Sequence, residues 1–387
     1  MLKKLINDFK EKFGLGEIKT FFAPGRVNLI GEHTDYNGGH VFPCALSFGT
    51  YGVVRPRKDK KLRFYSNNFE EVGVIEVDLE NLVYDERDHW ANYPKGVIKI
   101  FKDSGYDLKT GFDMLVFGNI PNGAGLSSSA SVELLTSVIL KELYKIEIEM
   151  IEMVKISQKA ENEFIGVNCG IMDQFAIGMG KKDRAMLLDC NTLEYIYAPV
   201  ELGDASIIIA NTNVRRGLAD SNYNERREEC ERALGELQTV LNIKSLGDLT
   251  IEEFEKNKEL IKNKIDRKRA RHAVYENQRT IEAVEKLECG NIQRFGQLMN
   301  ESHISLRDDY EVTGIELDTM VRLAWNETGV IGARMTGAGF GGCTVNIVKN
   351  KNIDSFIKNI GEKYKDEIGL TADFYVASIG DGARELI

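Results

Sequence analysis

The sequence lacks the features of several protein classes. Its six cysteines form no C-x-x-C pair and show no metal-type spacing, and a chain with a large core does not need disulfides. No apolar stretch approaches the length of a membrane span. The first residues, MLKKLINDFKEKFG, predict an amphipathic helix and lack the apolar centre of a signal peptide. These absences predict reduced thiols and a cytoplasmic protein that does not contact a membrane.

Excess positive charge is absent too. The formal net charge of the 387-residue chain is −10, which argues against nucleic-acid binding, because that function needs a basic surface to neutralise phosphates. The run KNKIDRKRARH at 262–272 holds six Lys or Arg residues, but the acidic EEFEKNKE before it cancels most of that charge. Both parts fit a solvent-facing helix with ion pairs three and four residues apart. Small molecules are therefore the expected partners.

Proline is missing from the second half of the chain, since all six prolines lie at or before Pro199. Strand-like runs dominate residues 1–120, and helical patterns dominate 128–165 and a charged region at about 220–300. Later segments predict another helix near 315–327 and strands at SIIIANTNV, CTVNIV and ADFYVASI. The pattern predicts an α+β fold with two domains, residues 1–200 and 201–387.

What is present is a set of glycine-rich stretches with unusual polar content. The first, APGRVNLIGEHTDYNGGH at 23–40, places Arg26, Glu32, His33 and Asp35 among turn residues. The apolar alternation before them predicts a strand, so these side chains would lie at a strand end, where sites are often built. A solvated turn is the alternative, because Gly, Asn and Asp are ordinary turn residues.

The second stretch, FGNIPNGAGLSSSASVELLTS at 117–137, reads as a strand, a loop with Gly123 and Gly125, three serines and a helix. Glycines let the backbone approach a ligand, and free N–H groups at a helix N-terminus favour an anion. The pattern predicts a phosphate-binding loop, with a serine helix cap as the structural alternative. No lysine follows the glycines, so the loop is not of the P-loop type.

A third stretch, RMTGAGFGGCTVNIV at 334–348, has glycines at 337, 339 and 342 in a G-x-G-x-x-G spacing. A dinucleotide fingerprint would open a helix, whereas a β-branched run follows here. We therefore expect a tight glycine hairpin packed beside a ligand or another loop.

A fourth stretch, AENEFIGVNCGIMDQFAIGMG at 160–180, contains Asp173 among apolar residues. A partly desolvated aspartate needs a cationic partner to stay ionised, and Arg26 is the candidate.

Three of these stretches together resemble a known family. GRVNLIGEHTDY at 25–36 is similar to the galactokinase signature at every position. PNGAGLSSSAS at 121–131 and MTGAGFGGC at 335–343 resemble the nucleotide loop and the third motif of the wider superfamily of galactokinase, homoserine, mevalonate and phosphomevalonate kinases. The motifs occur in family order and span most of the chain. The first is specific to galactokinases and their closest sugar-kinase relatives, whereas the other two indicate only a small-molecule kinase.

The resemblance implies a two-domain α/β kinase with its active site in the cleft between the domains. Such an enzyme transfers the γ-phosphoryl group of ATP, with Mg²⁺, to the anomeric hydroxyl of galactose, the first committed step of galactose catabolism. Asp173 would be the catalytic base, and Arg26 the partner that keeps it ionised. The implied sugar-binding residues are Glu32, His33, Thr34, Asp35, Gly170 and Tyr223. The implied nucleotide-binding residues are Ser66, Trp90, Gly123, Ala124, Gly125, Leu126, Ser127, Ser128 and Ser129, with Ser129 and Glu161 as Mg²⁺ ligands.

Other functions stay open at this point. A kinase for N-acetylgalactosamine or a related sugar would need room near Cys169 and Gly170 that the sequence does not show. A non-catalytic galactose and ATP sensor is disfavoured by the intact GLSSSAS loop and by Asp173. A dehydrogenase that uses the G-x-G-x-x-G spacing is the most distant alternative. We expect a monomer rather than an obligate oligomer.

Overall fold

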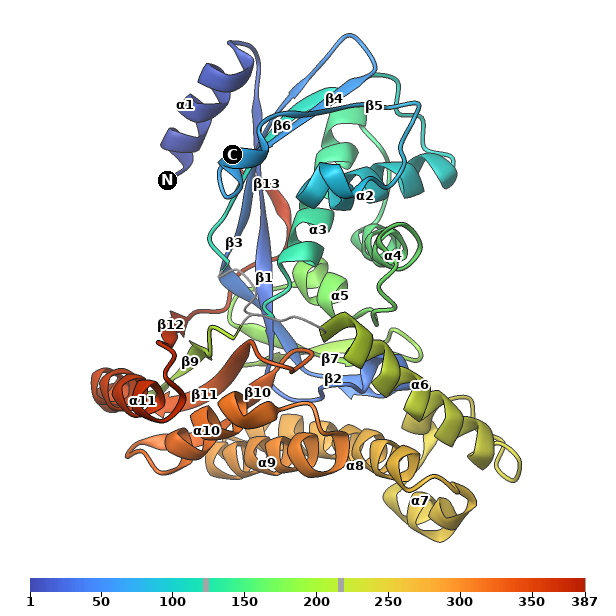
Figure 1. Cartoon of the computed structure of the whole chain (residues 1–387), viewed down its shortest axis with the longest axis vertical. Helices are drawn as coiled ribbons and strands as arrows, with labels where there is room; N and C mark the ends of the chain where they lie inside the picture. Colours follow the sequence, from blue (N-terminus) through green and yellow to red (C-terminus); the bar gives the residue numbers. More distant parts are fainter. Residues whose placement is uncertain (121–124, 215–218, 387) are drawn as a thin grey trace.

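The computed structural model describes residues 1–120, 125–214 and 219–386. Two bodies follow one another along the long axis of the molecule (Figure 1). The upper body contains the large sheet with α1 to α5, and the lower body contains a smaller sheet with α6 to α11. The mixture of helices and antiparallel strands confirms the α+β fold class.

The large sheet has six strands in the order β13-β1-β3-β6-β4-β5. Neighbouring strands are antiparallel except β4 and β6, which are parallel. The strands are β1 (Lys19–Asn28), β3 (Pro43–Pro56), β4 (Lys61–Ser66), β5 (Ile75–Asp78), β6 (Phe112–Gly118) and β13 (Arg384–Leu386). Strand β13 pairs with β1, so the end of the chain returns to the sheet that its beginning forms.

Helices cover both faces of this sheet (Figure 1). On one face lies α1 (Leu2–Phe13), the predicted amphipathic helix, which buries Leu5, Phe9 and Phe13. On the other face lie α2 (Asn92–Asp103), α3 (Ser128–Tyr144), α4 (Met150–Ala160) and α5 (Met172–Met179).

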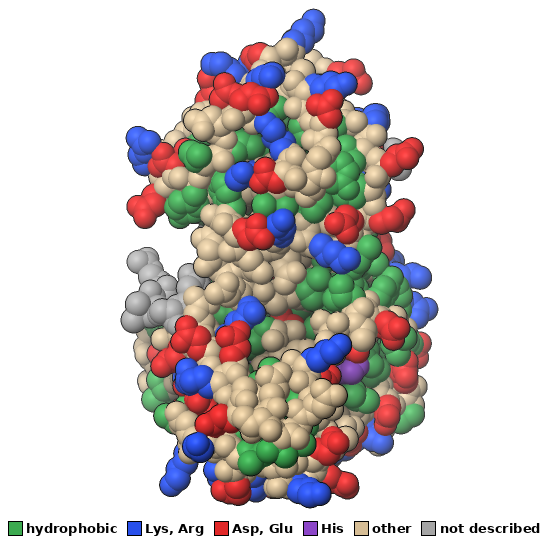
Figure 2. Space-filling view, turned by 90° about the vertical axis from the view of Figure 1, so that its right-hand side faces the viewer, with side chains coloured by type: hydrophobic (Ala, Val, Ile, Leu, Met, Phe, Trp, Pro, Cys, Tyr) green, Lys and Arg blue, Asp and Glu red, His purple; other side chains and the backbone are tan. Residues whose placement is uncertain are grey.

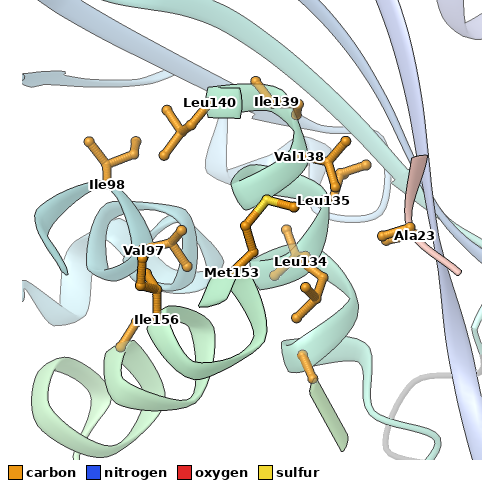
Figure 3. Packing of buried hydrophobic residues seen from close by; sticks show 14 of the residues in the cluster. Ala23, Val97, Ile98, Leu134, Leu135, Val138, Ile139, Leu140, Met153 and Ile156 are labelled. Carbon is orange, nitrogen blue, oxygen red and sulfur yellow. The ribbon is translucent and has the colours of Figure 1, made fainter. Parts of the chain in front are cut away.

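Helix α3 is the centre of the upper core, because every residue from Ala130 to Leu140 is buried. Figure 3 shows its side chains between the β1 residue Ala23 on one side and residues of α2 and α4, such as Val97 and Met153, on the other. A helix that is buried on all sides is held in place by the elements packed around it. Its N-terminus, which follows the serine-rich loop, is therefore a fixed point.

The lower sheet has the order β10-β11-β9-β12 and is antiparallel throughout. Its strands are β9 (Ala205–Asn211), β10 (Val330–Thr336), β11 (Cys343–Lys349) and β12 (Asp373–Ala377). Its helices are α6 (Ala219–Leu237), α7 (Ile251–Asn257), α8 (Lys264–Glu288), α9 (Ile292–Ser305), α10 (Gly314–Trp325) and α11 (Ile353–Ile368). Alternate β9 residues face opposite ways: Ile207 packs with α8 and α9, and Ile208 packs with α10 and α11.

A third, small sheet lies between the two bodies (Figure 1). It consists of β2 (His40–Val41), β7 (Arg184–Asp189) and β8 (Tyr195–Pro199). One apolar cluster joins Val27 and Phe42 to Ile207, Phe295 and Val345, so the two halves of the chain share a core. The boundary near residue 200 stays a prediction.

The basic run at 262–272 differs from its prediction. The acidic stretch before it forms the separate helix α7, and the basic run begins α8. Arg269 and His272 are buried, because this face of α8 packs against other elements of the lower body. The expectation of one solvent-facing helix is therefore wrong.

Surface charges of both signs are interspersed over the face in Figure 2. Within the part of the chain that the structure describes, no helix combines the length and the apolar character that a membrane crossing requires.

Candidate active site

The polar turn after β1 is compact and buried. Gly31 has a φ of 96°, and an added Cβ would lie 2.7 Å from the His40 carbonyl oxygen, so only glycine fits there. Arg26, Glu32 and His33 are at most 4% exposed. The solvated-turn alternative is therefore wrong, since the charged side chains point into the protein.

Thr34 supports this turn from within. Its hydroxyl lies 2.8 Å from the Gly31 carbonyl oxygen and 2.7 Å from that of His40. The side chain is fully buried and is not part of the cavity wall described below.

Arg26 and Asp173 form the predicted ion pair. Arg26 Nε lies 2.8 Å from Asp173 Oδ1, and its Nη2 lies 3.0 Å from Oδ2, so the contact is bidentate. The Ser127 hydroxyl donates to the same carboxylate, and Arg26 also donates to the Gly125 carbonyl. Asp173 stands in the first turn of α5, where the helix dipole favours a negative charge.

The Asp35 carboxylate lies directly against the backbone of Gly170. Backbone N–H groups of Tyr36 and Met172 donate to its carboxylate. Burial, with a further contribution from the negative charge of Asp173, raises the pKa of Asp35 to about 6. A Cβ at position 170 would lie 1.9 Å from Asp35 Oδ2, so only a glycine leaves room for this carboxylate.

His33 is held in one neutral form. Its Nε2 lies 3.2 Å from the Ala338 carbonyl and must donate to it, so its Nδ1 accepts from the Tyr36 hydroxyl at 2.7 Å. Burial lowers the pKa of His33 to about 3, and the ring stays uncharged at neutral pH. The Tyr36 hydroxyl lies 2.7 Å from that of Tyr310, which continues the chain of hydrogen bonds.

Glu32 has a complete set of donors. Its Oε1 accepts from the Gly337 N–H at 2.7 Å and from the Thr336 hydroxyl at 3.0 Å. Its Oε2 accepts from Asn28 Nδ2 at 2.6 Å and pairs with Arg334 at 2.7 Å. The carboxylate thus ties the polar turn to the third glycine-rich stretch.

That third stretch is the predicted hairpin. Strands β10 and β11 pair on either side of it, and no helix follows its glycines. An added Cβ on Gly337 would lie 2.9 Å from the Gly125 carbonyl oxygen, so the hairpin packs against the serine-rich loop as predicted.

A cavity of about 140 Å³ collects most of the predicted sugar residues. Its wall includes Arg26, Glu32, His33, Asp35, Gly170, Asp173 and Tyr223, together with Glu161, Gly337 and Ala338. Of the eight residues predicted as catalytic or sugar-binding, only Thr34 does not line this cavity.

A second cavity of about 520 Å³ lies at the N-terminus of α3. Ser66, Trp90, Ser128 and Ser129 line it as predicted. Trp90 Nε1 is buried and has no hydrogen-bond partner among the described residues, so it offers a donor to a ligand.

The other nucleotide residues of the sequence prediction lie elsewhere. The large cavity is not lined by Gly125, Leu126 or Ser127. The carbonyl oxygens of Gly125 and Leu126 accept hydrogen bonds from Arg26, and the Ser127 hydroxyl donates to Asp173. The predictions for Gly123 and Ala124 lie outside the described residues.

The two predicted metal ligands lie together. Glu161, at the start of a single π-helical turn (Glu161–Ile165), accepts a hydrogen bond from Ser129 and one of 2.6 Å from Gln174 Nε2. Burial and the charge of Asp173 raise the pKa of Glu161 to about 7. No group of three or more His, Cys, Asp or Glu side chains with metal-site geometry occurs in residues 1–120, 125–214 and 219–386. One carboxylate and one hydroxyl suit Mg²⁺, which takes few protein oxygens and completes its shell with phosphates.

Comparison with known proteins decides the family. The sequence matches the galactokinase galactose-binding signature over residues 7–56, the GHMP kinases N terminal domain over 92–181 and the GHMP kinases C terminal over 280–366. A galactokinase of Fusobacterium nucleatum is 65% identical over 388 residues, which cover all of both chains. This chain belongs to the galactokinase family. A galactokinase of Clostridium beijerinckii is 61% identical over 99% of this chain and 98% of its own.

Solved structures agree with galactokinase family membership. The crystal structure of Lactococcus lactis galactokinase complexed with galactose matches with a TM-score of 0.98, at 52% identity and over all of both chains. The Methanococcus jannaschii mevalonate kinase, at 19% identity, matches with a TM-score of 0.65 over 95% of this chain and all of its own, and shows the shared fold alone. The chain is therefore a sugar kinase with the GHMP kinase fold.

Sequence reasoning missed several polar side chains of this galactokinase site. Arg334 binds Glu32, Gln174 bridges Glu161 and the buried Glu133, and Tyr36 orients His33. Arg334 precedes MTGAGFGGC and Gln174 follows Asp173 directly, so their position beside a motif was the available signal. No sequence motif lies beside the other residues that were missed, which line the large cavity: Asn68, Phe69, His89 and Tyr93.

Proposed function

We propose that this chain transfers the γ-phosphoryl group of ATP to the C1 hydroxyl of D-galactose and forms galactose 1-phosphate. The observation that carries the proposal is the Arg26–Asp173 pair. It lies in the wall of the small polar cavity and is bound to Gly125 and Ser127 of the phosphate-loop stretch. In this place the carboxylate can accept from a sugar hydroxyl while the guanidinium lies beside the phosphate that the hydroxyl attacks.

Asp173 acts as the general base in this proposal. It accepts the proton of the C1 hydroxyl as that oxygen bonds to the γ-phosphorus and the bond to the β-phosphate oxygen breaks. The bidentate contact with Arg26 at 2.8 and 3.0 Å places a positive charge beside Asp173 and fixes its orientation. The guanidinium also places positive charge beside the transferred group, where negative charge must be stabilised.

Galactose binds in the small cavity. Asp35 accepts hydrogen bonds from its hydroxyls. The remaining wall is shaped by Tyr223, neutral His33, Gly170 and the Glu32 carboxylate, whose oxygens already bind four protein donors. Such buried polar groups reject a sugar epimer, because the wrong epimer leaves one of them without its partner. Thr34 holds the turn without contacting the sugar.

ATP binds in the large cavity, with its base near Trp90 and Ser66 and its phosphates at the N-terminus of α3. Ser129 and Glu161 are the proposed Mg²⁺ ligands. Bound Mg²⁺ neutralises phosphate charge and orients the γ-phosphoryl group. The assignments of Gly123 and Ala124 to this loop stay predictions, as do a monomeric state and a cytoplasmic location.

A coupled assay of ADP release tests the proposal. ATP turnover should be fast with galactose and slow with glucose, mannose, N-acetylgalactosamine and mevalonate. A preference for N-acetylgalactosamine would instead support the related sugar kinase. Binding of galactose and ATP without ADP release would support the sensor.

A further inference from the structure

Behind the sugar cavity lies a buried polar network centred on Glu276 of α8. This side chain is fully buried, and its Oε1 accepts from the Gly31 backbone N–H at 3.1 Å. The same carboxylate accepts from the Ser302 hydroxyl of α9 and pairs with Arg279. A carboxylate of the lower body thus holds the backbone at the point where the sugar-binding turn begins.

A second route from Glu276 to the turn passes through Arg334 of β10. Arg334 is fully buried, and its Nε donates to Ser302 Oγ at 3.2 Å while its Nη1 lies 2.7 Å from Glu32 Oε2. Ser302 accepts from Arg334 and donates to Glu276, and Arg334 Nη2, which has no hydrogen-bond partner among the described residues, lies 4.0 Å from Glu276 Oε1. The network therefore reaches the turn at its backbone and at one of its side chains.

The charges of this network balance. Glu32 and Glu276 carry two negative charges, and Arg334 and Arg279 carry two positive charges, with all four side chains at most 12% exposed. Removing one member of such a set leaves a buried charge without compensation, so the neighbouring groups must move. Gly31 admits no side chain that could take over, because a Cβ there meets His40 and Thr280 within 3 Å.

We infer that Glu276 and Arg334 are positioning residues for galactose binding, which hold the Gly31 backbone and the Glu32 carboxylate in the orientation that the sugar requires. Neither side chain lines the sugar cavity, so both act through the turn. The inference rests on the proposed role of that turn in binding galactose.

The test measures galactose and ATP dissociation constants, KM, kcat and the melting temperature of the full chain. Glu276→Ala and Arg334→Lys should weaken galactose binding about tenfold or more, because the first removes the contacts of Glu276 with Gly31, Ser302 and Arg279 and the second removes the guanidinium that joins Ser302 to Glu32. ATP affinity should change by less than about threefold, since the large cavity does not touch the network. Glu276→Gln keeps an acceptor oxygen for Gly31 and should recover most of the galactose affinity lost in Glu276→Ala.

Arg55→Lys is the matched control. Arg55 also binds a fully buried carboxylate, Asp113, at 2.6 Å, but on a sheet strand remote from the sugar cavity. The Arg55→Lys variant should have a lower melting temperature than the wild type and an unchanged galactose affinity.

Wild-type galactose affinity in a folded Glu276→Ala or Arg334→Lys variant would overturn the inference. Equal losses of galactose and ATP affinity would also overturn it, because they indicate a general structural role. If a variant does not fold, the comparison of Glu276→Gln with wild type decides, with a galactose-specific loss of about threefold expected from the missing charge. Failure of the wild-type chain to bind galactose would instead refute the proposed function.

Discussion

A single methyl group at position 170 tests the geometry of the sugar cavity. In Gly170→Ala the new Cβ would lie 1.9 Å from Asp35 Oδ2 and 2.3 Å from its Cγ. Ordinary contacts of this kind exceed about 3 Å, so the carboxylate or the backbone must move by about 1 Å. Asp35 would then lose part of its contact with the N–H groups of Tyr36 and Met172 and its alignment with the sugar hydroxyls.

The size of the effect follows from these contacts. A hydrogen bond to a charged group contributes about 1.5–3 kcal/mol, which corresponds to a factor of about 10 to 100 in affinity. Galactose affinity, measured by calorimetry, should fall by that factor, and kcat/KM should fall at least as far because a shift of about 1 Å also disturbs alignment. ATP affinity should stay unchanged, since Gly170 and Asp35 do not line the large cavity.

Gly235→Ala is the control for this substitution. Gly235 lies in α6, and apart from its chain neighbours and the backbone of its own helix no described atom lies within 4 Å of the position that its Cβ would take. Alanine there should leave both affinities unchanged and stabilise the helix by about 0.5–1 kcal/mol. Galactose affinity in Gly170→Ala equal to wild type would refute the placement of Asp35 against the sugar.

Three further predictions concern the chemistry. Asp173→Asn should lower kcat about 10²-fold or more while galactose affinity stays within about tenfold, and near-normal turnover would move the base elsewhere. Ser129→Ala and Glu161→Gln should each raise the Mg²⁺ concentration that gives the half-maximal rate. Each should also weaken the binding of Mn²⁺, measured by electron paramagnetic resonance, and wild-type metal affinity in both variants would refute the assignment of these two residues as metal ligands. Because the pKa of Asp35 is raised to about 6, galactose affinity should fall as the pH is lowered from 7 to 5, and less so in Asp35→Asn. Without galactose, the stability of the protein should depend on pH in the opposite direction. The raised pKa of Asp35 stabilises the folded protein at low pH, and this contribution to the free energy of unfolding, measured by chemical denaturation, is lost as the pH rises through about 6.

Local patterns predicted much of the fold. Strands β1 and β3 to β6 of the large sheet and helices α1, α3 and α4 follow from periodicity, because each buries one face or is buried all round. Strands β7, β8 and β13 were not predicted. The three residues of β13 form a strand only because β1, more than 350 residues earlier in the chain, offers an edge. No local pattern carries that information.

The same distinction applies to the site. Each contiguous motif predicted its own residues, and the Arg26–Asp173 pair was predicted because an ionised aspartate among apolar residues needs a cation. The supporting contacts join distant segments: Glu276 and Gly31 are 245 residues apart. Arg269 and His272 were misjudged because a basic run shows its charge but not which side chains another helix covers.

Identification of the reaction product is the most direct test of the proposed phosphoryl transfer to galactose. Phosphorus-31 NMR of a reaction of the chain with ATP, Mg²⁺ and galactose should show one new sugar phosphate, with the phosphate on C1 and in a one-to-one ratio to ADP. This signal should form at least about 10²-fold more slowly in Asp173→Asn, which lacks the proposed base. Phosphate on another hydroxyl, or ADP that forms equally without galactose, would contradict it.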